Sequence, residues 1–176
     1  LEFIPEDASR ESLLDDVQEM EQMVTEILET ARLKSEYGQL NLQKTDLVKL
    51  IRDICITFEG QIPGIRFENV PETFQTFVDT EQIETVLKNL LDNALKYSTV
   101  GNAPVEICLK KSDAGTLIEI QDRGPGIQDE ELDLIFEPFY RTDKSRNRKT
   151  GGYGLGLSLC KTIIEAHGGT IDVQSN

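Results

Sequence analysis

The stretch "NLLDNALKYS", residues 89–98, decides the fold and holds the first candidate site. Asn89, Asn93 and Lys96 follow one another at spacings of four and three, and Tyr97 comes next. These polar residues therefore lie along one edge of a helix whose other positions are apolar. Asparagine is a poor residue for a helix interior, because its side chain competes for backbone hydrogen bonds. An amide oxygen suits magnesium, and the lysine would lie beside any phosphate that the metal bridges. The alternative is a polar helix edge that faces solvent.

A second candidate is "IQDRGPGI", residues 120–127, where an alternating strand pattern ends at Asp122. Gly124 and Gly126 follow directly, and glycine permits positive φ and a close approach of the backbone. A carboxylate at a strand end beside bare backbone can accept a hydrogen bond from an exocyclic amino group, as recognition of adenine requires. The alternative is a plain turn of the DxG type, which is common.

A third candidate is "GGYGLGLSLCKTII", residues 151–164, in which four glycines precede and enter an apolar helical pattern. Bare amides and a helix N-terminus then point at one place, which is an arrangement that binds phosphate. The stretch is neither a Walker A loop, because no GKS or GKT follows, nor a dinucleotide fingerprint, because no strand leads into it. A flexible loop is the alternative.

The basic segment "YRTDKSRNRKT", residues 140–150, stands out in a chain of net charge -14. That net charge disfavours nucleic acid or an anionic membrane as a partner, so an anionic ligand needs a local cluster of positive charge. The segment predicts a mobile lid that closes over a triphosphate, and a solvated basic loop is the alternative. Its basic residues, set against the single acid Asp143, are Arg141, Lys144, Arg146, Arg148 and Lys149.

Residues 1–36 differ from the rest, with 11 acidic residues, 3 basic residues and no glycine. Their apolar residues alternate spacings of four and three, and additional apolar positions widen the stripe, which predicts a helix in a helical bundle. The alternative is a helix that packs on its own domain. The alternating positions are Leu13, Val17, Met20, Val24, Ile27 and Ala31, widened by Leu14, Met23 and Leu28.

The remaining chain predicts an α+β fold, a two-layer α/β sandwich with a mixed, mostly antiparallel sheet and helices on one face. Asp46 and either Asp79 or Thr80 are expected to cap the second and third helices. We expect the strands of residues 64–70 and 73–78 to pair with each other, and the longer strands of residues 104–111 and 115–122 to form a hairpin. A short helix near residues 130–136, a helix over 155–166 and a final strand complete the expectation.

Cysteine and histidine are scarce. Cys55, Cys108 and Cys160 lie inside apolar segments without metal-site spacing, which favours core residues of a reduced, cytosolic protein. No segment is apolar enough for a membrane span, and no signal peptide opens the sequence. The single histidine, His167, precedes two glycines, so we expect it to close the last helix, where a cation suits the helix dipole.

The candidate stretches, in this order, resemble the ATP-binding catalytic domain of bacterial sensor histidine kinases of two-component systems, in the GHKL superfamily. "NLLDNALKYS" resembles that family's N box, "DRGPGI" its G1 box, "FEPFYR" its F box and "GGYGLGLSL" its G2 box. The resemblance covers residues 40–175 and implies the Bergerat fold. It also makes 37–176 the catalytic domain, missing its last strand, and 1–36 the second helix of the dimerisation and phosphotransfer domain, without the phosphoacceptor helix.

The resemblance implies roles for individual residues. Asn93 would be the magnesium ligand, and Asp122 would bind the adenine amino group. Asn89 stands where related ATPases have a glutamate that activates water, and an amide cannot act as that base. Residues expected to act in catalysis are Asn89, Lys96, Arg141 and Arg146; residues expected to bind the nucleotide are Asn93, Lys96, Tyr97, Asp122, Gly124, Gly126, Arg141, Arg146, Gly152, Gly154, Leu155, Gly156 and Leu157.

The implied activity is that of a protein-histidine kinase with ATP and Mg²⁺ as cofactors. The intact parent would transfer the γ-phosphoryl group to a histidine absent from this sequence and then to a response regulator. The resemblance implies that the parent is a homodimer, that this part of it is cytoplasmic, and that the parent can be anchored in the inner membrane. This chain alone is expected not to autophosphorylate and to contact neither nucleic acid nor membrane. The alternatives are an ATPase of the gyrase, Hsp90 and MutL type and a non-catalytic nucleotide-binding dimerisation module.

Overall fold

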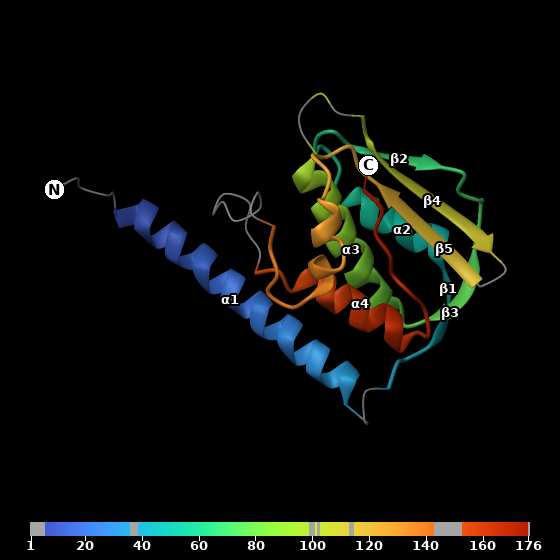
Figure 1. Cartoon of the computed structure of the whole chain (residues 1–176), viewed down its shortest axis with the longest axis horizontal. Coiled ribbons are helices and arrows are strands. Elements are labelled where there is room, and N and C mark those ends of the chain that lie inside the picture. The colour runs from blue at the N-terminus through green and yellow to red at the C-terminus, as the bar shows by residue number, and fades with distance from the viewer. Residues whose placement is uncertain are drawn as a thin grey trace.

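A computed structural model describes residues 6–35, 39–98, 101, 103–112, 115–142 and 153–175. The chain forms an α+β fold that a long helix precedes, as the sequence predicts (Figure 1). The elements in order are α1 (Glu6–Lys34), β1 (Gln43–Asp46), α2 (Leu47–Ile56), β2 (Ile65–Glu68), β3 (Gln75–Val78), α3 (Thr80–Tyr97), β4 (Val105–Ser112), β5 (Gly115–Gln121), the 3-10 turns η1 (Asp129–Glu131) and η2 (Leu134–Phe136), and α4 (Gly156–Ala166).

The strands form two small sheets. β1 pairs with β3 antiparallel, while β4 lies between a parallel β2 and an antiparallel β5. The β4–β5 hairpin is confirmed, but the expected pairing of the strands at 64–70 and 73–78 is wrong, because β2 and β3 belong to different sheets. A parallel pair needs a long crossover, and the segment with β3 and α3 supplies it between β2 and β4. The expected final strand is also wrong, since the residues from 170 to 175 form none.

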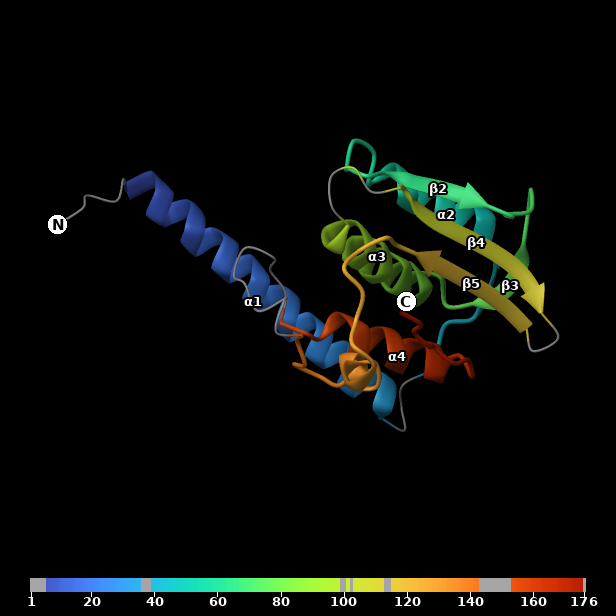
Figure 2. The ribbon, with the colours of Figure 1, turned by 45° about the horizontal axis from the view of Figure 1, so that its top comes forward.

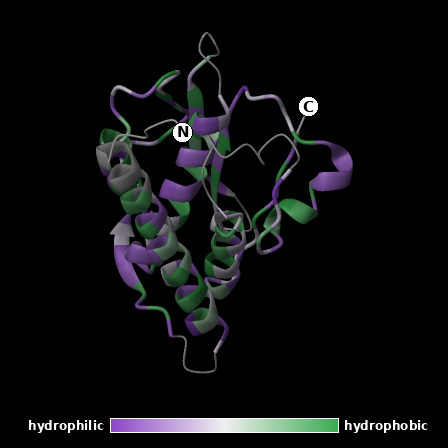
Figure 3. Ribbon diagram, turned by 90° about the vertical axis from the view of Figure 1, so that its left-hand side faces the viewer, coloured by the Kyte–Doolittle hydropathy of each residue, from purple (hydrophilic) through white to green (hydrophobic). Residues whose placement is uncertain are grey.

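The main core lies between the β2–β4–β5 sheet and helices α2 and α3, which cover one face of it (Figure 2). Alternate residues of β4 point into this core, and Val105, Ile107 and Leu109 are fully buried there. Ile51 from α2 and Leu91 from α3 are fully buried against them. Each helix is therefore apolar on one side only, and green and purple stretches alternate along the helices of Figure 3.

Aspartates cap both helices of this layer, as expected. Asp46 precedes α2 and accepts hydrogen bonds from the N–H groups of Val48, Lys49 and Phe74. These donors, chiefly Phe74 N–H, hold the pKa of Asp46 below its usual value. Asp79 precedes α3 and accepts from Gln82 N–H at 3.2 Å. The caps fix where the two helices start relative to the sheets.

Helix α1 behaves differently along its length. Its C-terminal part lies beside α4, whereas its N-terminal part projects away from the rest of the molecule (Figures 1 and 2). Leu33 is buried in a second cluster with residues of α3 and α4, whereas the apolar stripe further back is exposed. The exposed members are Leu13, Leu14, Val17, Met20, Val24, Ile27 and Leu28. In the part of the chain that the structure describes, no helix combines the length and apolarity that a membrane crossing requires.

The three cysteines are free thiols. Cys160 is fully buried, as expected of a core residue, and burial raises its pKa to about 12. Cys55 and Cys108 are only half-buried, which departs from the expectation, although burial still raises the pKa of Cys55 to about 11. Cys55 and Cys160 therefore stay protonated and unreactive at neutral pH.

Candidate functional site

The polar edge of α3 forms one wall of the candidate site. Asn89, Asn93, Lys96 and Tyr97 are all half-buried, as expected for an edge between core and solvent. The Asn89 amide nitrogen donates to the Thr85 carbonyl at 3.1 Å, and the Lys96 ammonium lies 5.7 Å from the centre of the Tyr97 ring. Among the described residues, the Asn93 side chain has no hydrogen-bond partner, so its amide oxygen is available to a ligand.

The turn after β5 lies against the C-terminal end of α3. Gly124 N–H donates to Asp122 Oδ1 at 2.7 Å, which folds the strand end into a tight turn. A Cβ at Gly124 would lie 2.9 Å from the Tyr97 carbonyl oxygen, so only glycine lets the two backbones approach this closely. Gly126 has φ +71°, the left-handed region that glycine favours. The structure thus brings Asp122, which is exposed to solvent, to the same end of the molecule as Tyr97.

The start of α4 lies against the middle of α3. A Cβ at Gly156 would lie 2.8 Å from Asn89 Oδ1, so the first turn of α4 rests on the Asn89 side chain. The residue before it, the buried Leu155, occupies the N-cap position. A leucine side chain has no atom that accepts a hydrogen bond, so it does not cap the first amides of α4. Such a helix start suits an anion, because amides and the helix dipole both favour negative charge.

The segment after η2 is joined to the glycines before α4. Phe139 N–H donates to the Gly154 carbonyl at 2.9 Å, and Phe139 itself has φ +66°. Gly154 has φ +76°, and a Cβ there would overlap the Tyr140 carbonyl oxygen. The backbones of Gly154 and Tyr140 therefore lie too close together for a side chain at position 154. Arg141 follows directly and is half-buried.

Some of the expected site residues lie outside the described part of the chain. Arg146, Gly152 and most of the basic segment belong to this group, so the expected lid stays a prediction. Leu157 is half-buried in the first turn of α4, beside Gly156.

Two contacts near the site could not be inferred from the sequence. The Ser175 hydroxyl accepts from Ile127 N–H at 2.8 Å, which ties the chain end to the turn of Gly126. The Tyr140 hydroxyl donates to Glu131 at 3.2 Å. Ser175 is 48 residues away from its partner and stands in no motif, so no signal in the sequence could have identified it.

Two further observations concern metal binding and the position of a cavity. Among the described residues, no cluster of three or more His, Cys, Asp or Glu side chains could hold a metal ion. A magnesium ion needs few protein ligands when phosphate and water supply the rest, and the unpartnered amide of Asn93 fits that requirement. An open cavity of about 480 Å³ lies elsewhere, where β2 leads into β3, and shares none of these residues; it is lined by Asn69, Val70, Pro71, Thr73, Phe74, Leu109, Lys110 and Lys111.

Comparisons with known proteins show which family and which solved structures the chain resembles. The sequence profile of the family "Histidine kinase-, DNA gyrase B-, and HSP90-like ATPase" matches residues 78–176. The chain is 36% identical over 169 residues to the sensor histidine kinase YkoH of Bacillus subtilis, covering 95% of this chain and 36% of YkoH. It is 34% identical over 176 residues to the sensor protein SrrB of Staphylococcus aureus, covering 96% of this chain and 30% of SrrB. The chain thus spans about a third of the length of these relatives.

Solved structures give the same result. The histidine kinase AdeS of Acinetobacter baumannii superposes with a TM-score of 0.74 at 27% identity, over 93% of this chain and 76% of that one. The mycobacterial sensor histidine kinase MprB superposes with a TM-score of 0.61 at 30% identity, over 72% of this chain and 80% of that one. Both are similarities of fold and sequence.

Proposed function

Because the chain belongs to the family of histidine kinase-, DNA gyrase B- and HSP90-like ATPases, we propose that it binds Mg-ATP and delivers the γ-phosphoryl group to a histidine outside this sequence. One observation carries the proposal. Two close approaches at glycines, Gly124 on the Tyr97 backbone and Gly156 on the Asn89 side chain, gather three separate sequence motifs around the polar edge of α3. A side chain at either glycine would press on Tyr97 or on Asn89 and push these elements apart.

Each wall of this site has a proposed role. Asp122 accepts a hydrogen bond from the adenine amino group, and Gly124 and Gly126 shape the turn around the base. The Asn93 oxygen would hold Mg²⁺, which would supply positive charge to neutralise the phosphates. Further nucleotide contacts come from Lys96, Tyr97, Arg141, Arg146, Gly152, Gly154, Leu155, Gly156 and Leu157.

The chain's contribution to catalysis is positioning and charge. Phosphoryl transfer needs little covalent chemistry from the protein, so catalysis rests on holding the phosphates in line and stabilising their charge. The uncapped amides at the start of α4 orient the phosphates, while Lys96, Arg141 and Arg146 offset negative charge. No described residue of the site is proposed as a covalent nucleophile.

Asn89 favours a kinase over an ATPase that hydrolyses its own nucleotide. Its amide nitrogen already donates to Thr85, and an amide oxygen cannot take a proton from water. Water near the phosphates therefore lacks a base at this position. A steady-state phosphate-release assay separates the two functions, because an ATPase would turn over continuously and a kinase domain alone would not.

Helix α1 supports a role in a larger kinase. Its exposed apolar stripe, from Leu13 to Leu28, is the kind of surface that a bundle of helices covers. We propose that it is the second helix of a dimerisation and phosphotransfer domain in a homodimeric parent, which relays the phosphoryl group to a response regulator.

The test uses ATP labelled in the γ position. This chain should bind it but acquire no acid-labile phosphate, whereas a separately supplied helical hairpin that carries a phosphoacceptor histidine should become labelled. The chain has a single histidine, so the result is unambiguous. Acid-labile phosphate on this chain, or no ATP binding at all, would contradict the proposal.

A further inference from the structure

Helices α3 and α4 form a closely packed antiparallel pair. Gly156 at the start of α4 rests on Asn89, Cys160 donates its thiol proton to the Val86 carbonyl at 3.8 Å, and His167 at the end of α4 meets Asp79 at the start of α3. Small or buried residues at the first two contacts let the helices approach closely. The end at Gly156 faces the proposed nucleotide site, and the end at His167 lies about 16 Å away along α4, at 1.5 Å per residue.

The His167 ring is held at both nitrogens. Nδ1 lies 2.8 Å from the Ile163 carbonyl oxygen, and Nε2 lies 3.1 Å from the backbone nitrogen of Asp79. A carbonyl oxygen can only accept and a backbone N–H can only donate, so Nδ1 carries the proton and Nε2 accepts. The expectation that His167 closes α4 is confirmed by its C-cap position, but the expectation of a cation is wrong, because a protonated ring could not accept from Asp79 N–H.

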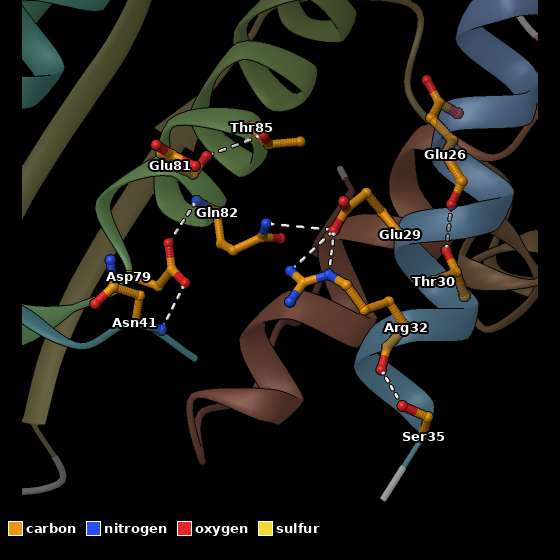
Figure 4. Close-up of polar contacts among 10 residues, drawn as sticks. All are labelled: Glu26, Glu29, Thr30, Arg32, Ser35, Asn41, Asp79, Glu81, Gln82 and Thr85. Atoms are coloured by element: carbon orange, nitrogen blue, oxygen red, sulfur yellow. Dashed lines mark hydrogen bonds and ion pairs between the residues drawn. The ribbon is translucent and has the colours of Figure 1, made fainter. Parts of the chain in front are cut away.

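Asp79 is the centre of a wider junction. Its side chain, 7% exposed, accepts from Asn41 N–H at 2.9 Å with Oδ2 and from Gln82 N–H at 3.2 Å with Oδ1. The Gln82 side chain reaches across to Glu29 of α1 at 3.5 Å (Figure 4). The junction therefore joins the start of α3, the end of α4 and the segment that leaves α1.

We propose that His167 is a positioning residue, which as a neutral imidazole fixes α4 lengthwise on α3 and thereby holds the start of α4 at the nucleotide phosphates. This inference rests on the proposed function, since it concerns the same site. The mechanism is mechanical: the contact at Gly156 is glycine against an amide side chain and tolerates sliding, whereas the hydrogen bonds of His167 are directional. Without them the pair loses the hydrogen bond that joins the end of α4 to the start of α3, and the long thiol contact of Cys160 with Val86 remains.

Protonation of His167 should release the tie. The proton would sit on Nε2 and face another donor, the Asp79 N–H. The charged groups that the printed contacts tie into this junction are the Asp79 carboxylate before α3 and, through Gln82, the ion pair of Glu29 and Arg32 on α1 at 3.0 Å. The Asp79 carboxylate is engaged with two backbone donors, so a turn of the imidazolium towards it would still give up the bond to Asp79 N–H.

The first test needs no substitution. The chain has one histidine, so the ring nitrogens can be assigned directly by ¹⁵N NMR of the whole chain near pH 7.5. We expect the neutral form with the proton on Nδ1. A ring with the proton on Nε2, a protonated ring or rapid averaging between tautomers would overturn the proposal, whether or not any variant folds.

The second test compares two variants by calorimetry with Mg-ATP. His167→Gln can place an acceptor where Nε2 lies, whereas His167→Asn can match only Nδ1 and leaves Asp79 N–H without its partner. We expect His167→Gln to bind like wild type and His167→Asn to bind roughly fivefold more weakly. Equal affinities for wild type and His167→Asn would contradict this inference alone, while a wild-type chain that binds no Mg-ATP would contradict the proposed function.

Discussion

The two ends of the α3–α4 pair are built in opposite ways. At the site end, α4 begins with glycines on the Asn89 side chain, and its N-cap residue is a leucine. At the far end, His167, Asp79 and Asn41 form directional hydrogen bonds, and Leu33 of α1 covers the helices beside them. In our proposal, the site end leaves amides and an asparagine oxygen for a ligand, and the far end supplies the rigidity. A binding site made of backbone groups keeps its geometry only when the helices that carry those groups are held in place by other contacts.

The largest effect is expected from Gly154→Ala at the site end. The residue has φ +76° and its Cβ would overlap the Tyr140 carbonyl oxygen, so both strain and overlap apply. We expect a loss of about 2–5 kcal/mol in the free energy of unfolding, together with loss of Mg-ATP binding. Denaturant titration and calorimetry measure the two.

Gly60→Ala is the matched control for this change. Gly60 has φ +85°, but a Cβ there meets nothing within 4 Å, so only the backbone cost of about 1–2 kcal/mol applies. Equal losses for the two variants would show that the contact between Gly154 and Tyr140 does not exist.

Leu33→Ala tests the cover at the far end. Leu33 is 8% exposed and packs with Val86, Leu159 and Ile163, so its truncation should cost about 2–3 kcal/mol in the free energy of unfolding. Leu28→Ala on the same helix removes a side chain that is 63% exposed and should change stability by less than about 0.5 kcal/mol. If both substitutions are neutral, α1 does not dock on α4 in solution.

Asp122→Asn sharpens the chemistry at the site end. The amide oxygen can still accept from Gly124 N–H and keep the turn, but the charged acceptor for an adenine amino group is lost. We expect the dissociation constant for Mg-ATP to rise roughly 10–100-fold with stability unchanged. Asp129→Asn, at an exposed position of η1, should bind normally. An Asp122→Asn variant with unchanged affinity would remove Asp122 from the site.

The smallest effect is expected from Asp46→Asn, at the residue that caps α2 as Asp79 caps α3. Because folding lowers the pKa of Asp46, its contribution to stability is present above the unfolded-state pKa and is lost as the pH falls through the folded-state pKa. Asparagine still caps a helix but carries no charge. The thermal midpoint should therefore lie slightly below that of wild type near neutral pH and converge with it in acid, which scanning calorimetry over a pH series measures. A constant difference would contradict this account.

Local signals predicted much of the fold. Asp46 and Asp79 stand directly before apolar helical patterns, and both are N-caps. The hairpin of β4 and β5 follows from two alternating runs with a short connection. β2 and β3 were paired wrongly because neighbours in sequence favour a hairpin, whereas the parallel partner of β2 comes only after α3. The alternation of apolar and polar residues identifies a strand but does not indicate which other strand it pairs with.

The sequence predicts the motifs of the candidate site, but not the contacts that support it. Asn93, Asp122 and Gly156 stand in patterns whose chemistry can be read from residue type and spacing. His167 and Asp79 are 88 residues apart, and each has a complete local explanation as a helix cap, so neither suggests the other. Bonds that join two caps depend on the tertiary packing of α3 and α4 and leave no trace in a periodic pattern.

The central claim, a Mg-ATP site on the polar edge of α3, is tested most directly by calorimetric titration of ATP with and without Mg²⁺. Wild type should bind tightly only with Mg²⁺, and Asn93→Ala should lose more than about 100-fold of that affinity, since even partners outside the first coordination sphere contribute roughly 10–100-fold. Asp92→Ala, at an exposed neighbouring position, should bind like wild type. Unchanged, magnesium-dependent binding by Asn93→Ala would contradict the account.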